Sequence, residues 1–182
     1  MFSMRRHANF IKRFKSVSCL FTASILFPMQ ISAAVSDYDA LVIEARGGNS
    51  APLLRYLEDQ GKKSALTPNQ VADWLQVSSW VENNDKTTIE IWQRYRGQMD
   101  VPARGKVAAA RAYRNQKNWN DSLAVWERVL QEEPDNVDVR TGWIMTLADA
   151  RYNQQALTEA NKWAQAHPGA DSDALLAYVY HS

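Results

Sequence analysis

One spacing recurs along this chain of 182 residues and limits what it can fold into. Residues of the same type stand 34 positions apart at three places: Pro68 and Pro102, Trp92 and Trp126, Pro134 and Pro168. A period of this length is typical of paired helices that stack on their neighbours, because one pair alone cannot bury its apolar face. The spacing therefore predicts a row of helix-turn-helix units that share one elongated core.

The hydrophobic pattern agrees with a helical chain. From residue 35 onward, apolar residues recur at steps of three and four, and no alternating segments bounded by hairpin turns are present. The predicted helix breaks are Gly47-Gly48, Gly61, Asn83-Asn84, Gly97, Asn118, Pro134, Tyr152-Asn153 and Pro168-Gly169, which separate nine helical stretches. We therefore expect an all-α fold, specifically a tetratricopeptide-repeat solenoid.

One helix start can be predicted from local chemistry alone. Thr67 suits the N-cap position, Pro68 the first helical position, and Gln70 can close a capping box with Thr67. We expect a helix to begin at Pro68.

Two units match the repeat pattern best. The first runs over 103–136, with Tyr113, Ser122, Trp126 and Pro134 at its packing positions. The second runs over 137–170, with Leu147, Ala156, Trp163 and Pro168 in comparable places, but it has Ala160 where the pattern expects a large aromatic residue. Weaker units cover 35–68 and 69–102, so the predicted repeat domain, 35–182, holds about four repeats.

Residues 171–182 are predicted to form the first helix of a further, incomplete repeat. An end of this kind leaves apolar side chains uncovered. We expect exposure at Leu175, Leu176, Tyr178 and Tyr180, and interpret the chain as a fragment or a truncated reading frame.

The first 34 residues have the pattern of a cleavable secretory signal. Five basic residues and no acidic ones precede an apolar run over 17–27, and small residues follow at Ser32, Ala33 and Ala34. We expect cleavage after Ala34, or else after Ala33. The alternative is a retained anchor, although the apolar run is too short to span a bilayer.

Removal of that segment would change the chemistry of the chain. Cys19, the single cysteine, lies within it, so residues 35–182 hold no thiol for a disulfide or a thiolate metal site. Five of the 21 basic residues also lie there while all 20 acidic residues follow, which leaves a net charge of −4. A mildly acidic domain without a basic stripe does not suggest nucleic-acid binding.

No catalytic, metal or cofactor pattern is visible. The three histidines have no partner at ligand spacing, and phosphate loops and nucleophile elbows are absent from the sequence. Glu132 and Glu133 are adjacent, so on a helix they point about 100° apart, and we interpret them as a solvated helix end. We expect a protein that is not an enzyme and needs no cofactor or metal.

The repeat frame does suggest a binding surface. Trp92, Trp126 and Trp163 fall at or near packing positions, whereas Trp80 falls on the inner face of a first helix, where it could be core or could bind a ligand. The surface lined by first helices is where such solenoids bind. Its candidate residues are Asp39, Arg46, Asp73, Trp80, Arg104, Arg111, Arg114 and Asn115. The three arginines could meet carboxylates, phosphorylated groups or sugar hydroxyls, and the alternative is a solvated helix face.

Several runs of residues resemble one family more closely than a generic repeat protein. They are 38–49 (YDALVIEARGGN), 63–66 (KSAL), 69–76 (NQVADWLQ), 94–96 (RYR), 102–105 (PARG), 112–115 (AYRN) and 146–150 (TLADA). In order and spacing they are similar to the N-terminal tetratricopeptide region of the outer-membrane porins that export poly-β-1,6-N-acetyl-D-glucosamine, a biofilm polysaccharide.

This resemblance implies a periplasmic domain associated with the outer membrane of a Gram-negative bacterium. In that family the repeats receive partly deacetylated polymer, dock a periplasmic deacetylase and precede an outer-membrane β-barrel. No barrel-strand pattern is present in this sequence, so only the guiding and docking roles carry over. The alternative function is a general periplasmic adaptor that binds proteins or peptides.

Overall fold

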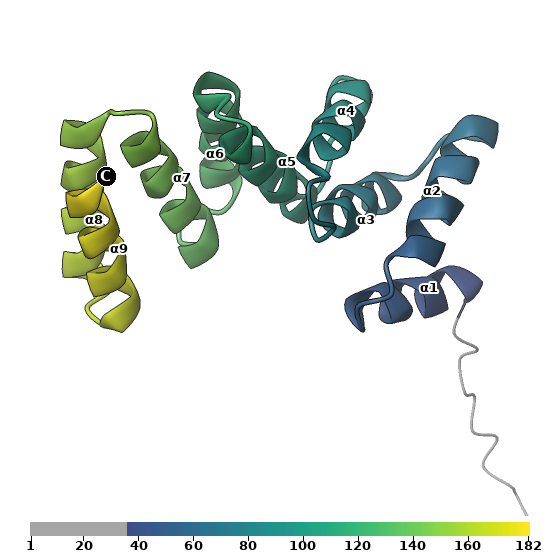
Figure 1. The fold of residues 1–182 in the computed structure, drawn as a ribbon, viewed down its shortest axis with the longest axis horizontal. Coiled ribbons are helices and arrows are strands. Elements are labelled where there is room, and N and C mark those ends of the chain that lie inside the picture. Colours follow the sequence, from purple (N-terminus) through teal and green to yellow (C-terminus); the bar gives the residue numbers. More distant parts are fainter. Residues whose placement is uncertain (1–35) are drawn as a thin grey trace, which may run out of the picture. The chain divides into compact units, whose positions relative to one another are not determined.

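A computed structural model describes residues 36–182. The expected signal segment, 1–34, lies outside these residues. The helices are α1 (Asp37–Arg46), α2 (Ala51–Lys63), α3 (Pro68–Ser78), α4 (Asp85–Tyr95), α5 (Ala103–Asn115), α6 (Trp119–Glu132), α7 (Val137–Asp149), α8 (Asn153–Ala166) and α9 (Ala170–His181) (Figure 1).

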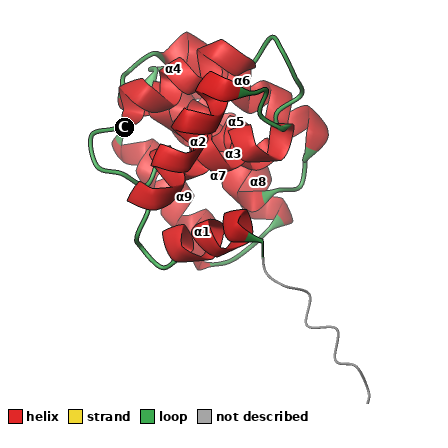
Figure 2. Ribbon diagram, turned by 90° about the vertical axis from the view of Figure 1, so that its right-hand side faces the viewer, coloured by secondary structure: helices red, strands yellow, loops and turns green. Residues whose placement is uncertain are grey.

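The predicted all-α class is confirmed for the described residues, which contain helices and connecting loops but no strand (Figure 2). The predicted number of nine helical stretches is also confirmed over residues 36–182. One predicted boundary is wrong, because Gly61 lies inside α2, which continues to Lys63. A Cβ at Gly61 would lie 3.0 Å from the Tyr95 hydroxyl and 3.4 Å from the Trp74 ring. This glycine therefore permits close packing on α3 and α4 and does not end the helix.

The predicted start of α3 is confirmed. Thr67 Oγ1 accepts from the Gln70 backbone N–H at 3.3 Å, and Gln70 Oε1 accepts from the Thr67 backbone N–H at 2.9 Å. Pro68 occupies the first turn, where its missing N–H is not needed. The reciprocal pair of bonds satisfies two donors that a helix start would otherwise leave unpaired.

The turns that join odd-numbered to even-numbered helices repeat with the period seen in the sequence. Asn83, Lys117 and Arg151 have φ of 59°, 60° and 67°, and each stands 34 residues after the one before. After α5, the Lys117 N–H bonds to the Arg114 carbonyl and the Asn118 N–H to the Tyr113 carbonyl, and the turn after α7 repeats this pattern. This is the Schellman arrangement, which ends a helix with one left-handed residue and reverses the chain.

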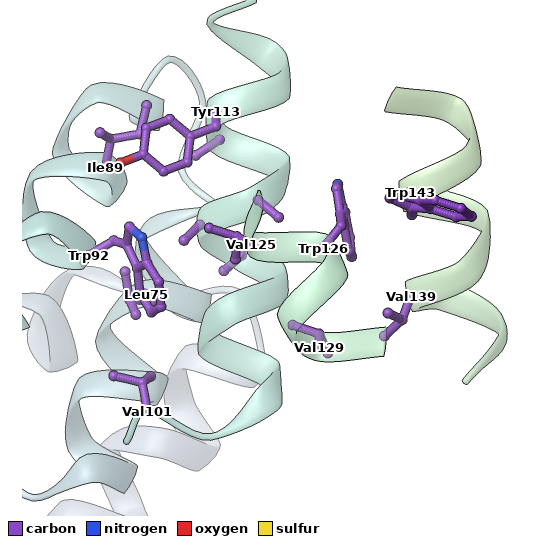
Figure 3. Packing of buried hydrophobic residues seen from close by; sticks show 14 of the residues in the cluster. Leu75, Ile89, Trp92, Val101, Tyr113, Val125, Trp126, Val129, Val139 and Trp143 are labelled. Carbon is purple, nitrogen blue, oxygen red and sulfur yellow. The ribbon is translucent and has the colours of Figure 1, made fainter. Parts of the chain in front are cut away.

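Successive helices pack in order along the chain. Each helix contacts the next from α1 to α9, and odd-numbered helices also contact one another from α3 to α9. Trp126 of α6 is fully buried and points toward Trp143 and Val139 of α7 (Figure 3). Trp92 and Trp163 are buried as well, so the core positions predicted for these tryptophans are confirmed.

Small residues allow the closest helix contacts. A Cβ at Gly105 would lie 2.9 Å from the Cα of Ala72, which places the backbones of α5 and α3 nearly in contact. Ser122 is buried where α6 crosses α5 and donates from Oγ to the Ala110 carbonyl at 2.8 Å. The small position predicted at Ser122 is therefore confirmed.

Helix α9 differs in part from the expectation that its apolar residues are exposed. Tyr180 is 67% exposed, as predicted, but Leu175 is buried against the α7–α8 pair, and Leu176 and Tyr178 are partly buried. The prediction was wrong for Leu175 because α9 packs on both α7 and α8.

A buried cation was not expected from the sequence. Lys106 of α5 is buried, and its Nζ donates to Asp100 at 2.9 Å and to Glu132. Burial alone would lower the pKa of this ammonium group, but the hydrogen bonds to Glu132 and Asp100 outweigh it and raise the pKa. Glu132 is the exposed last residue of α6, as interpreted from the sequence, and it is also a partner of the buried Lys106 charge.

Candidate functional site

The eight residues predicted to form a binding surface do not form one continuous row. Asp73, Arg104 and Arg114 belong to two polar triads, Arg111 lines a cleft together with Arg104, and the other four lie at helix ends and turns.

The first triad joins α1, α3 and α5. The Tyr38 hydroxyl donates to Asp73 Oδ2 at 2.7 Å, and Arg104 Nε donates to Asp73 Oδ1 at 3.1 Å. Arg104 also donates from Nη2 to the backbone and side-chain oxygens of Asn69, at 3.2 and 3.1 Å. Asp73 is 8% exposed. Burial and the hydrogen bond to Asp73 raise the pKa of Tyr38 well above its usual range, so this tyrosine stays a neutral donor.

The second triad has the same residue types and joins α5, α7 and α9. Arg114 Nε donates to Asp149 Oδ2 at 2.6 Å and Nη2 donates to the Tyr178 hydroxyl at 2.9 Å, while Tyr178 donates to Asp149 Oδ1. Burial and the bond to Asp149 raise the pKa of Tyr178. Both triads tie together three odd-numbered helices, so Asp73, Arg104 and Arg114 stabilise the arrangement of helices in addition to any contact with a ligand.

A cleft of about 250 Å³ lies beside α5, between α3 and the start of α7. We call it the α5 cleft; its lining residues are Gln76, Ala103, Arg104, Val107, Arg111, Glu133, Asn136, Asp138 and Val139. Arg104 and Arg111 are the two predicted site residues that the structure brings together. They stand seven positions apart on α5, and this spacing places both on one face of the helix.

Hydrogen bonds in the loop between α6 and α7 fix two polar side chains of the α5 cleft, Asn136 and Glu133. Asn136 caps α7 by accepting from the Val139 N–H at 3.2 Å, and its Nδ2 donates to Glu133 Oε2 at 2.7 Å. Arg111 is exposed and forms no ion pair within residues 36–182. The cleft thus presents two guanidinium groups, of which that of Arg104 is paired with Asp73, and two carboxylates and two amides around a partly apolar wall.

The remaining predicted residues lie elsewhere. Asp39 accepts from the Ser36 hydroxyl at the start of α1, and Arg46 is exposed in its last turn. Asn115 donates from Nδ2 to Asp85 Oδ1 at 3.1 Å, between α5 and α4.

The repeat frame predicted that Trp80 lies on the inner face of a helix, and this prediction was wrong. Helix α3 ends at Ser78, and Trp80 follows in the turn toward α4, where it is 48% exposed. The difference arises because the turn after α3 begins earlier than the frame allows. Trp80 is therefore not a core residue.

The sequence did not identify several residues that complete these sites. Tyr38, Asp149 and Tyr178 complete the triads, and Gln76, Glu133, Asn136 and Asp138 line the α5 cleft. A signal was present for the triads, since Tyr38 and Asp73, and likewise Arg114 and Asp149, are 35 residues apart, close to the repeat period. No comparable signal marked the cleft carboxylates.

These side chains are suited to binding. The α5 cleft offers paired donors and acceptors of the kind that recognise hydroxyl, amide and ammonium groups. Within residues 36–182, no three His, Cys, Asp or Glu side chains are grouped so that they could hold a metal ion. None of the helices α1 to α9 is long and apolar enough to cross a membrane.

Comparison with known proteins finds relatives that share one name. The chain is 45% identical over 166 residues to the poly-beta-1,6-N-acetyl-D-glucosamine export protein of Escherichia coli K12, and equally similar to the protein of that name from Escherichia coli O157:H7. The match covers 88% of this chain and 20% of each relative, so the chain spans about a fifth of the length of the curated relatives it matches. The resemblance seen in the sequence runs is confirmed. No family model and no solved structure matches the chain.

Proposed function

We propose that this chain is a non-catalytic periplasmic scaffold of a poly-β-1,6-N-acetyl-D-glucosamine export system, associated with the outer membrane. The observation that carries the proposal is the 45% identity to a region of the export protein over 88% of the chain. Residues 1–34 act as the cleavable signal that directs residues 35–182 to the periplasm.

The helix pairs are tetratricopeptide repeats in this proposal. Three features support it: the left-handed residues Asn83, Lys117 and Arg151 recur every 34 positions, successive helices pack in order, and small residues stand where helices cross. Repeats of this kind stack into one core and leave the odd-numbered helices to line a binding surface.

Partly deacetylated polymer binds in the α5 cleft. Deacetylation converts some acetamide groups to amines, which are positively charged near neutral pH. Glu133 and Asp138 would accept hydrogen bonds from such an ammonium group, while Arg111 and Gln76 would donate to hydroxyl and acetamide oxygens. The two carboxylates would therefore favour the deacetylated polymer over the fully acetylated one.

Calorimetric titration of glucosamine oligomers tests this site. We expect the chain to bind partly deacetylated oligomers more tightly than fully acetylated ones, and Glu133→Gln and Asp138→Asn each to reduce this preference by about fivefold. The matched control is Glu127→Gln, which removes an exposed carboxylate of α6 outside the cleft. Equal affinity for both oligomers, or equal losses in all three variants, would contradict the assignment.

Docking of a periplasmic deacetylase is the second part of the proposal. Its support is the similarity to the export protein, and the test is recovery of that enzyme with the chain from periplasmic extract.

The alternative function is a general periplasmic adaptor for proteins or peptides. It would be favoured if extended peptides of unrelated sequence bound in the α5 cleft and the oligomers did not.

A further inference from the structure

A second cavity, between α4 and α6, shares no lining residue with the α5 cleft. We call it the α4–α6 groove; its volume is about 370 Å³, and its lining residues are Trp92, Arg96, Gly97, Tyr113, Asp121, Ala124, Val125 and Arg128. Gly97 borders open space, since a Cβ built there would have no neighbour within 4 Å.

The floor of the α4–α6 groove holds a hydrogen-bond donor without an acceptor. Trp92 is 2% exposed, and its Nε1 has no hydrogen-bond partner within residues 36–182. Figure 3 shows this nitrogen on the side of the indole ring that faces Tyr113. Buried polar groups are nearly always paired in folded proteins, so an unpaired buried donor that lines a cavity points to a ligand that supplies the acceptor.

The Tyr113 hydroxyl, also buried, accepts a long hydrogen bond of 3.4 Å from Gln93 Nε2, and its own proton has no acceptor in the described part of the chain. Trp92 and Tyr113 both line the groove, so two neutral side chains there can each donate a hydrogen bond.

Two arginines stand at the rim of the α4–α6 groove. Arg96, which follows α4, and Arg128 of α6 are exposed, and neither forms an ion pair within 4.0 Å in residues 36–182. Their forked guanidinium groups match a carboxylate in shape and charge. Asp121 is the one carboxylate in the lining, and it opposes an incoming anion.

We propose that the α4–α6 groove binds a glutamate or aspartate side chain from an acidic peptide segment of a partner protein. Arg96 and Arg128 pair with the carboxylate, Trp92 and Tyr113 donate to it from the floor, and the apolar walls at Ala124 and Val125 contact the methylene carbons of the side chain. Within residues 36–182, the α5 cleft sets two carboxylates beside one unpaired arginine, Arg111, whereas this groove sets one carboxylate beside two unpaired arginines. The groove therefore favours an anionic partner over the amine-bearing polymer, and it is a protein-docking site distinct from polymer binding.

The test follows the Trp92 indole N–H directly. In a ¹⁵N-labelled chain, with this resonance assigned by Trp92→Phe, a hexaglutamate peptide is expected to shift the Trp92 resonance downfield, since a new hydrogen bond deshields the proton. Arg96→Gln and Arg128→Gln are each expected to weaken peptide binding by about fivefold, whereas Asp121→Asn is expected to strengthen it. Arg55→Gln is the matched control, because Arg55 is an exposed arginine of α2 outside the groove.

Three results would overturn the proposal. Peptide binding that leaves the Trp92 resonance in place would show that the groove is not the site. Equal weakening by all three arginine variants would show non-specific charge attraction. A Trp92 shift with inorganic phosphate but not with hexaglutamate would assign the groove to a different anion. This experiment uses no oligosaccharide, so a negative result would not bear on the proposal that the α5 cleft binds the polymer.

Discussion

The close approach of α5 to α3 at Gly105 makes Gly105→Ala the most informative stability test. In an isolated helix this change is favourable, because alanine is better than glycine in a helix interior by about 1 kcal/mol. In the folded chain the new methyl carbon would lie 2.8 Å from Val101 Cγ1, 2.9 Å from Ala72 Cα and 3.1 Å from Ala72 Cβ. Real methyl carbons do not approach this closely, so α3 and α5 must separate.

The net effect follows from these two opposing terms. Overpacking a well-packed core costs about 1–3 kcal/mol, and the upper part of this range applies because the Cα of Ala72 cannot rotate away. After the gain in helix propensity, Gly105→Ala is expected to lower the free energy of unfolding by about 2 kcal/mol. Gly61→Ala in α2 is the control, since its new methyl group would meet the movable end of Tyr95 at 3.0 Å.

Urea unfolding followed by helical circular dichroism measures the difference. We expect a lower midpoint for Gly105→Ala at an unchanged slope, and a midpoint for Gly61→Ala at or slightly above that of the parent chain. Equal midpoints for the two variants would contradict this expectation, because they would mean that α3 and α5 are not in close contact at Gly105.

Three further predictions can be checked with the same unfolding assay. Thr67→Ala removes half of the capping box at α3 and should lower the free energy of unfolding by about 1 kcal/mol; Thr67→Ser should restore most of it, and an equal loss in both would contradict the cap. Lys117→Gly places a glycine at φ 60° and should raise the free energy of unfolding by about 0.5–1 kcal/mol, whereas Lys117→Ala should not. The raised pKa values of Tyr38 and Tyr178 mean that the folded state holds these protons more tightly than the unfolded state. Their contribution is present below the unfolded pKa of about 10 and decreases as pH rises above it, so the unfolding midpoint should fall between about pH 9 and pH 11. The fall should be smaller in the Tyr38→Phe, Tyr178→Phe double variant, and an identical fall would contradict this origin.

Most of the local structure could be predicted from the sequence because its causes are local. The cap at Thr67 depends on residues three positions apart, and the helix breaks depend on residues that favour turns. Gly61 was the exception, since it serves a contact with Trp74 and Tyr95 that the local sequence does not reveal. The burial of Trp126 was predictable as well, because the repeat period specifies which positions face neighbouring helices.

The candidate binding residues were predicted less well because a helical periodicity identifies a face and not the partners on it. Arg104, Arg111 and Arg114 looked equivalent on one helix, yet Arg104 pairs with Asp73, Arg114 pairs with Asp149, and Arg111 lines the α5 cleft without an ion pair in residues 36–182. The long, flexible arginine side chain can reach several neighbours. Which neighbour it meets depends on the distance between helices.

Capping, turn preference and apolar spacing act over one helix or one repeat, so they predict short helices in pairs with a 34-residue period before any tertiary contact is known. Which charged side chains pair with one another inside the protein, and which remain available to a ligand, depends on how the helices pack. The partners of Asp73, Lys106 and Asp149 lie 6 to 35 residues away in the chain, and hydrogen bonds form only at about 3 Å. Such contacts exist only after the helices have packed.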